Sequence, residues 1–256
     1  MIAQFLRLLL GLALLPACWG VSRAFFDALV VSAGSAGWMT PETLSLLGGI
    51  LTFAFAWMAL SHPVRVYVLG HELTHALWGL LFGARPSDVR VSASGGSVRL
   101  TKSNLLITLA PYFFPFYTFV VIVVALITYA FIRPLPYLPL WLFLVGFTWS
   151  FHVLFTLETL TQRQPDVRLY GRIFSWVFIF LVNVAIILVW LATMTPLTFA
   201  DLGDILLSRL ADAYLGVWSF VCSSCSWLHA RMTASVDSHS IIHSFDYSII
   251  RLFDYS

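Results

Sequence analysis

Charged side chains are scarce in this sequence, and their scarcity limits the structural classes to which the protein can belong. Only 10% of the 256 residues are Asp, Glu, Lys or Arg, whereas roughly 25% is typical of a soluble domain. Hydrophobic residues make up 60% of the chain. This composition excludes an ordinary soluble protein and predicts an integral membrane protein. The chain has room for about five or six spanning helices of roughly 20 residues each, and none for a large soluble domain.

Cysteines and clustered basic residues are also few. Cys18, Cys222 and Cys225 do not provide a disulfide framework, and the pair at 222 and 225 lacks a second ordered ligand pair with which to form a zinc knuckle. The net charge is only +2, and no cluster of Lys and Arg forms a surface for nucleic acid. We therefore expect no nucleic-acid partner.

Apolar runs alternate with short polar breaks along residues 1–220, which predicts one membrane domain with its core at residues 64–193. The expected fold class is an all-α polytopic membrane protein with one short β-hairpin. Residues 201–220 mix acidic and apolar side chains, and this pattern predicts an interfacial or partly inserted helix. The expected spanning segments are residues 2–31, 43–60, 64–82, 105–131, 140–160 and 172–194.

Two features interrupt the helical pattern in the middle of the chain. Residues 84–104 predict the hairpin, because Ser94, Gly95 and Gly96 separate two stretches in which valine alternates with polar residues. Pro111 and Pro115 then fall inside the next apolar segment. Prolines free backbone carbonyl groups that must be satisfied within a membrane, so we expect this segment to be kinked toward the functional site.

Residues 221–256 differ from the rest of the chain. They are rich in Ser and His, lose the apolar periodicity, and end in two copies of an octapeptide, residues 241–248 and 249–256, with six of eight positions identical. A period of eight residues in two copies corresponds to no repeat fold. This segment predicts a disordered tail.

The segment with the clearest chemistry is the HExxH motif at residues 71–75. On a helix, His71 and His75 lie four residues apart on one face and can bind one zinc ion through their imidazole nitrogens. Glu72 lies beside them and is the natural general base for a water molecule activated by the metal. Three ionisable groups within an apolar run are costly unless they serve a site. The motif therefore predicts a zinc-dependent hydrolytic centre.

A zinc site of this kind needs a third protein ligand, which leaves the fourth position for water. Three downstream residues are candidates: Asp166, Glu158 and His152. Pro165 restricts the backbone just before Asp166, and irregular backbone at membrane depth is tolerated where it lines protein or a wet cavity. Asp166 is the first choice. Glu158 is the second, and His152 could instead be a buried polar contact of the site.

These features together resemble the site-2 protease class of intramembrane zinc metalloproteases. The resemblance rests on HExxH in a spanning helix, a β-hairpin after it, a next span with prolines, and an aspartate before a later span, over about residues 64–189. It implies a minimal, membrane-domain member with one zinc ion bound by His71, His75 and Asp166, and with Glu72 as general base. The implied activity is a zinc metalloendopeptidase that hydrolyses membrane-protein or peptide substrates at the bilayer.

Two other classes of function remain open. Val167 follows Asp166 where that family normally has glycine, so a catalytically inactive relative that binds membrane partners is the main alternative. A small transporter with broken helices is a further one, although the membrane domain has no internal repeat. The intact Glu72 favours an enzyme, because a binding protein has no physical need for a general base beside two metal ligands.

Basic residues predict the orientation in the membrane. The hairpin segment and residues 161–172 together contain seven basic residues, against the single Arg133 in the turn between them. By the positive-inside rule these two segments are cytoplasmic, which puts the zinc site nearer the cytoplasmic face. Counting the motif helix as a span places Arg7 on the opposite side, in conflict with the same rule.

Overall fold

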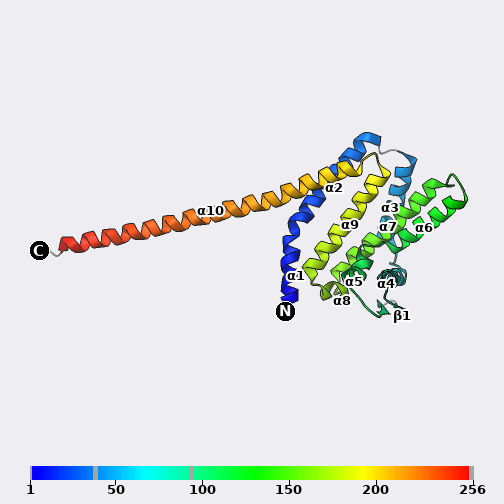
Figure 1. The fold of residues 1–256 in the computed structure, drawn as a ribbon, viewed down its shortest axis with the longest axis horizontal. Coiled ribbons are helices and arrows are strands. Elements are labelled where there is room, and N and C mark those ends of the chain that lie inside the picture. Colours follow the sequence, from blue (N-terminus) through cyan, green and yellow to red (C-terminus); the bar gives the residue numbers. More distant parts are fainter. Residues whose placement is uncertain (1, 37–39, 93–94, 254–256) are drawn as a thin grey trace.

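The computed structural model describes residues 2–36, 40–92 and 95–253, with their side chains except at 35–36, 230 and 232–253. These residues form helices and one antiparallel strand pair (Figure 1). In chain order the elements are α1 (Ile2–Ala13), α2 (Leu15–Ala36), α3 (Pro41–Ala59), α4 (Val64–Leu81), β1 (Pro86–Ser92), β2 (Gly95–Leu100), α5 (Leu105–Leu109), the 3₁₀ helix η1 (Ala110–Tyr112), α6 (Phe116–Phe131), α7 (Leu138–Thr161), α8 (Pro165–Leu169), α9 (Arg172–Met194) and α10 (Phe199–Phe253).

Among the described residues, five helical segments are long and apolar enough to cross a membrane. The pair formed by α5–η1 and α6 adds a sixth if the bent pair is one span. This agrees with the expected all-helical, multi-pass class. The five segments are Ile2–Gly34, Pro41–Ala59, Leu138–Thr161, Arg172–Met194 and Phe199–His229.

The motif helix α4 differs from the prediction that residues 64–82 span the membrane. The helix is present, but it is not among the candidate spans of the described chain. Figure 1 shows α4 nearly along its axis and α7 and α9 from the side, so α4 lies across the bundle rather than parallel to it. Its ionisable side chains, including Arg65 and Glu72, explain the difference, because they make α4 too polar for a lipid-embedded helix.

Helices α3 and α7 are in direct backbone contact at two glycines. A Cβ atom at Gly49 would lie 2.0 Å from the carbonyl oxygen of Phe143, and one at Gly146 would lie 2.1 Å from that of Leu46. Small residues at such positions allow helix backbones to approach closely, which is a common way of packing helices in membranes. Helix α4 follows α3 in the chain but lies across this pair rather than parallel to it.

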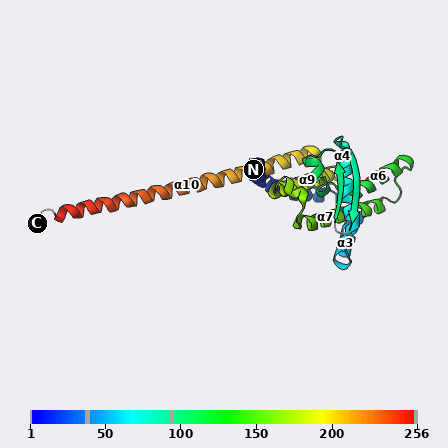
Figure 2. The same ribbon diagram turned by 90° about the horizontal axis from the view of Figure 1, so that it is seen from below.

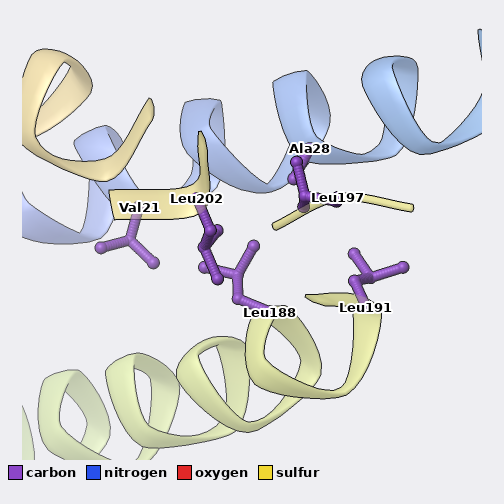
Figure 3. Packing of buried hydrophobic residues seen from close by; sticks show 6 residues of the cluster. All are labelled: Val21, Ala28, Leu188, Leu191, Leu197 and Leu202. Atoms are coloured by element: carbon purple, nitrogen blue, oxygen red, sulfur yellow. The ribbon is translucent and has the colours of Figure 1, made fainter. Parts of the chain in front are cut away.

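On the other side of the bundle, α2, α9 and α10 share an apolar core. Figure 3 shows Val21 and Ala28 of α2, Leu188 and Leu191 of α9, and Leu197 and Leu202 meeting in one cluster. Leu188 is 1% exposed and Leu197 is 2% exposed. An ion pair between Asp27 and Arg209 also joins α2 to α10.

The segment after the hairpin is broken, as its prolines predict. The axes of Leu105–Tyr112 and Phe116–Phe131 differ by 85°. Asn104 caps α5 by accepting a hydrogen bond from the backbone N–H of Ile107 at 2.9 Å. The kink brings η1 against α4, so the expectation of a bend toward the site is confirmed.

The hairpin is also confirmed, with a small change at its turn. β1 and β2 pair antiparallel from Pro86 with Leu100 to Ser92 with Gly95, and the register is interrupted near Asp88, whose φ is 52°. Gly95 and Gly96 belong to β2 rather than to the expected turn. Residue 94, the other residue of that turn, lies outside the described residues.

The C-terminal segment is helical in the structure, where disorder was expected from residue 221. Helix α10 runs without interruption from Phe199 to Phe253 and projects away from the other helices in both views (Figures 1 and 2). Residues 221–253 contain neither proline nor glycine, the two residues that most often end a helix. Residues 201–220, expected at the interface, fall in a segment apolar enough to cross a membrane.

The N-terminal half of α1, which contains Arg7, lies at the same end of the bundle as α8. The Arg7 Nη1 group donates a hydrogen bond to the carbonyl oxygen of Leu169 at 2.9 Å, and the Arg7 guanidinium lies 4.8 Å from the centroid of the Tyr170 ring. Between Arg7 and the hairpin, the segment Ile2–Gly34 and helix α3 each cross the bundle, and α4 does not. Two crossings return the chain to the side on which it started. The structure therefore corrects the expected placement of Arg7 opposite the basic segments.

Candidate metal centre

Helix α4 presents both histidines of the motif toward the same point. The ring centroids of His71 and His75 are 4.9 Å apart, with an angle of 76° between the ring planes. His75 is 9% exposed, and Glu72 between them is 6% exposed. The spacing of four residues thus produces the shared face that the sequence predicts.

Asp166 reaches this face from α8, a helix of one turn that starts at Pro165. Its Oδ2 atom lies 3.6 Å from Nε2 of His71 and 3.4 Å from Nε2 of His75. Among the described residues these three side chains form a group able to bind a metal, with their ligand atoms all within 4.8 Å of one another. The structure therefore brings the first-choice third ligand to the motif.

The distances fit the geometry of a small metal ion. In a tetrahedral zinc site with bonds of about 2.0 to 2.1 Å, neighbouring ligand atoms are about 3.3 Å apart. The two separations that involve Asp166, 3.6 and 3.4 Å, lie close to this value. Two imidazoles and one carboxylate are also a donor set of the kind found in catalytic zinc sites, which keep one position open.

Neighbouring groups orient the ligands. Nδ1 of His75 lies 2.9 Å from the carbonyl oxygen of Ile107, and since a carbonyl only accepts, Nδ1 carries the proton and Nε2 keeps its lone pair for a metal. The Tyr112 hydroxyl donates to Asp166 Oδ2 at 3.3 Å, and the Tyr67 hydroxyl lies 3.4 Å from Nδ1 of His71. Each ligand therefore has a partner behind it.

The pKa values of the two acids, Asp166 and Glu72, are shifted in opposite directions. Burial alone would raise the pKa of Asp166, but the neighbouring imidazoles of His71 and His75 outweigh it and hold that pKa well below its usual range. Burial raises the pKa of Glu72. An ionised Asp166 suits a metal ligand, and a Glu72 that accepts a proton more readily suits a general base.

Strand β2 packs directly against the motif helix at Gly96. A Cβ atom at this position would lie 2.8 Å from Oε1 of Glu72 and 2.6 Å from Cγ1 of Val68. Any side chain here would displace the Glu72 carboxylate or the strand. Gly96 therefore allows the hairpin backbone to approach the acid, a role that the sequence pattern alone does not reveal.

A cavity of about 800 Å³ opens in front of these groups. Its wall includes His71, Glu72, His75 and Asp166, the β2 residues from Gly95 to Val98, and the end of α7. The candidate metal-binding group and Glu72 are thus reached from one open space that borders the hairpin.

The other two candidate ligands lie apart from the group. Nδ1 of His62 is 3.9 Å from Oε2 of Glu158, and the His62 ring stacks on Trp57. His152 is buried, and it lines a separate cavity of about 20 Å³ that also touches the His71 ring. Neither completes a metal-binding group among the described residues, so Asp166 is the better-placed third ligand.

The residues that contact the candidate ligands from behind, Tyr67, Tyr112 and Ile107, do not belong to the motif. Tyr67 lies one turn before His71 on α4, so helical spacing could have suggested it. Tyr112 and the Ile107 carbonyl come from the broken segment, whose contacts with Asp166 and His75 depend on tertiary structure. No motif pointed to them.

Comparisons with protein-family models, with curated proteins and with solved structures give no match to this chain.

Proposed function

We propose that this chain is an intramembrane zinc metalloprotease of the site-2 protease type. One observation carries the proposal: His71, His75 and Asp166 converge on a single point beside Glu72, within a cavity that borders a β-strand. The apolar helices around this site are consistent with a membrane setting. The combination supports hydrolysis of peptide bonds in membrane-associated substrates.

Zinc is the metal that the ligands favour. Two imidazoles and a carboxylate with one open position form the donor set of hydrolytic zinc sites, whereas Mg²⁺ and Ca²⁺ prefer oxygen ligands alone. When bound, zinc would polarise the scissile carbonyl and acidify a water molecule at the open position.

The remaining work falls to the chain's own groups. Glu72 accepts a proton from the attacking water and delivers it to the leaving amine, which is general base and then general acid catalysis. Burial raises the pKa of Glu72, which makes it a better proton acceptor. Tyr112 and Ile107 keep Asp166 and His75 oriented during the reaction.

Strand β2 is the proposed docking edge for substrate. It lines the cavity from Gly95 to Val98, and the described strand pair consists of β1 and β2 alone. An unwound substrate segment could add to such an edge as a further strand, which exposes its peptide bonds. Gly96 would then bring the substrate backbone close to Glu72.

The alternative is a catalytically inactive protein that binds membrane partners through the same cavity. Its support is Val167, which follows Asp166 where the resembled family has glycine. Zinc-loaded protein that retains a membrane partner without cleaving it would favour this alternative.

The test compares wild type with Glu72→Gln in purified protein, measuring zinc by mass spectrometry and cleavage of a model transmembrane substrate in proteoliposomes. We expect about one zinc per chain in both, with cleavage reduced roughly 10²- to 10⁴-fold in the variant. Glu158→Gln is the matched control, because it makes the same change in the same cavity wall, and it should cleave normally. Undiminished cleavage by Glu72→Gln would refute the mechanism.

A further inference from the structure

A second, cationic cavity lies beside the metal centre. It measures about 290 Å³ and is lined by Arg163, Arg168 and Arg172, with Gln162, Gln164 and Trp176 among the other wall residues. All three arginines are exposed. The Arg172 guanidinium lies 5.1 Å from the centroid of the Trp176 ring, which holds it at the cavity wall.

These three positive charges have no carboxylate partner within the described part of the chain. Of the two acids nearest in sequence, Asp166 contacts His71 and His75, and Glu158 contacts His62. The ion pairs recorded for other arginines in that part involve Arg90, Arg99 and Arg209. A cavity lined by three guanidinium groups without carboxylate partners favours binding of an anion. Guanidinium groups form bidentate, charge-assisted hydrogen bonds to phosphate.

An apolar groove continues from this cavity. It measures about 580 Å³ and runs between Gln4 and Leu8 of α1 and Ile173, Phe174 and Trp176 of α9, and it shares Arg172 and Trp176 with the arginine cavity. α9 is a candidate span that begins at Arg172, so the arginines lie at its end and the groove follows its apolar surface. A tryptophan at this level is typical of a membrane interface.

We propose that the two cavities together form a binding site for an anionic phospholipid. The phosphate lies among Arg163, Arg168 and Arg172, and an acyl chain lies along the groove between α1 and α9. Basic pockets between helices at the cytoplasmic face bind such headgroups in membrane proteins. Charge complementarity selects an anionic lipid over a zwitterionic one, and the groove selects a lipid over a free phosphate.

The site adjoins the metal centre through a shared wall. Gln162, Arg163 and Gln164 line both the arginine cavity and the large cavity in front of the metal-binding group. Asp166 lies between Arg163 and Arg168 in sequence, so a bound lipid holds the segment that carries this ligand. Lipid binding itself does not depend on the proposed protease activity, whereas this coupling rests on it.

The test titrates full-length protein in nonionic detergent with dioctanoyl phosphatidylglycerol, dioctanoyl phosphatidylcholine or glycerol 3-phosphate, and measures bound ligand by native mass spectrometry. We expect phosphatidylglycerol to bind at least about tenfold more tightly than either comparator. Arg168→Gln with Arg172→Gln should remove this preference, while the charge-matched pair Arg85→Gln with Lys102→Gln, on and beside the hairpin, should keep it. Leu8→Gln should weaken the binding of phosphatidylglycerol and leave the binding of glycerol 3-phosphate unchanged.

Three results would overturn the proposal. Equal binding of the two lipids would show that the site does not select an anionic headgroup. If Arg85→Gln with Lys102→Gln lost the preference for phosphatidylglycerol as fully as the double arginine variant, the preference would come from general surface charge. Glycerol 3-phosphate binding as tightly as the lipid would remove the groove from the site. The Leu8→Gln variant keeps every arginine, so it tests the groove even if the double arginine variant does not fold. Zinc-free His75→Ala protein should still bind the lipid, which separates this site from the metal centre.

Discussion

The candidate metal centre and the leucine cluster on the other side of the molecule are built in opposite ways. The leucine cluster consists of Val21, Ala28, Leu188, Leu191, Leu197 and Leu202. Around the site, α4 lies across the bundle, α5, η1 and α8 are short, and buried polar groups such as Glu72, Thr74 and His75 are concentrated there. In the cluster of α2, α9 and α10, long helices meet through aliphatic side chains. One region gathers polar and ionisable side chains, and the other packs aliphatic ones.

The difference shows where polar chemistry can be placed in an apolar chain. A regular spanning helix satisfies its own backbone but exposes its side chains to lipid, where ionisable groups are costly. A crosswise α4 and the bend at η1 instead enclose these groups in protein. The free carbonyl of Ile107 then becomes the partner of His75. The irregular backbone is therefore part of the site.

The largest expected effect is on metal binding. His71→Ala, His75→Ala and Asp166→Ala should each lower zinc affinity by more than about 100-fold, because each removes one of three protein ligands. Glu158→Ala should leave zinc affinity unchanged, since Glu158 contacts His62 instead. Competition with a chelator measures both. If Glu158→Ala lost zinc and Asp166→Ala kept it, the third ligand would be Glu158.

A smaller effect is expected at Gly96. Gly96→Ala places a methyl group against Glu72, and a displacement of about 1 Å can reduce turnover roughly 100-fold without affecting the metal. Cleavage assays and zinc content on the same sample test this. The control is Gly95→Ala, where no atom lies within 4 Å of the added Cβ, although its φ of 140° adds backbone strain. Wild-type turnover in Gly96→Ala would show that the close approach has no functional role.

In the leucine cluster the expected effect is on stability rather than chemistry. Leu188→Ala creates a cavity at a side chain that is 1% exposed and should lower the free energy of unfolding by about 2 to 4 kcal/mol. The protein that remains folded should still bind about one zinc per chain. Thermal unfolding in detergent with metal analysis measures both quantities. Loss of zinc from folded Leu188→Ala would mean that the two regions are coupled.

Single-cysteine substitutions, which should change neither activity nor stability, test which side of the membrane each end of the helix bundle faces. In a cysteine-free background, single cysteines at Gln4 and Ser87 should both resist a membrane-impermeant thiol reagent in intact cells, and one at Tyr137 should react. The positive-inside rule gives this direction, and the contact of Arg7 with Leu169 puts the first two positions at one end. Labelling at Ser87 without permeabilisation would reverse the orientation.

Local chemistry explains which predictions succeeded. Proline at 111 and 115 broke the helix because proline lacks an N–H and clashes with the preceding turn. The hairpin followed from alternation and small residues, and HExxH placed two histidines on one face through helical spacing. Residues 221–253 are helical despite their polar composition, because no proline or glycine interrupts them.

The sequence by itself determined the apolar, mostly helical class, the positions of most helices, and the shared helix face of His71 and His75 beside Glu72, because composition and short-range spacing carry that information. Tertiary structure decided that α4 lies across the bundle, that Asp166 rather than Glu158 meets the histidines, and that Gly96 touches Glu72. It also put Arg7 beside α8 and so removed the conflict over orientation. These relations join residues far apart in the chain, and only the packing of helices against one another sets such distances.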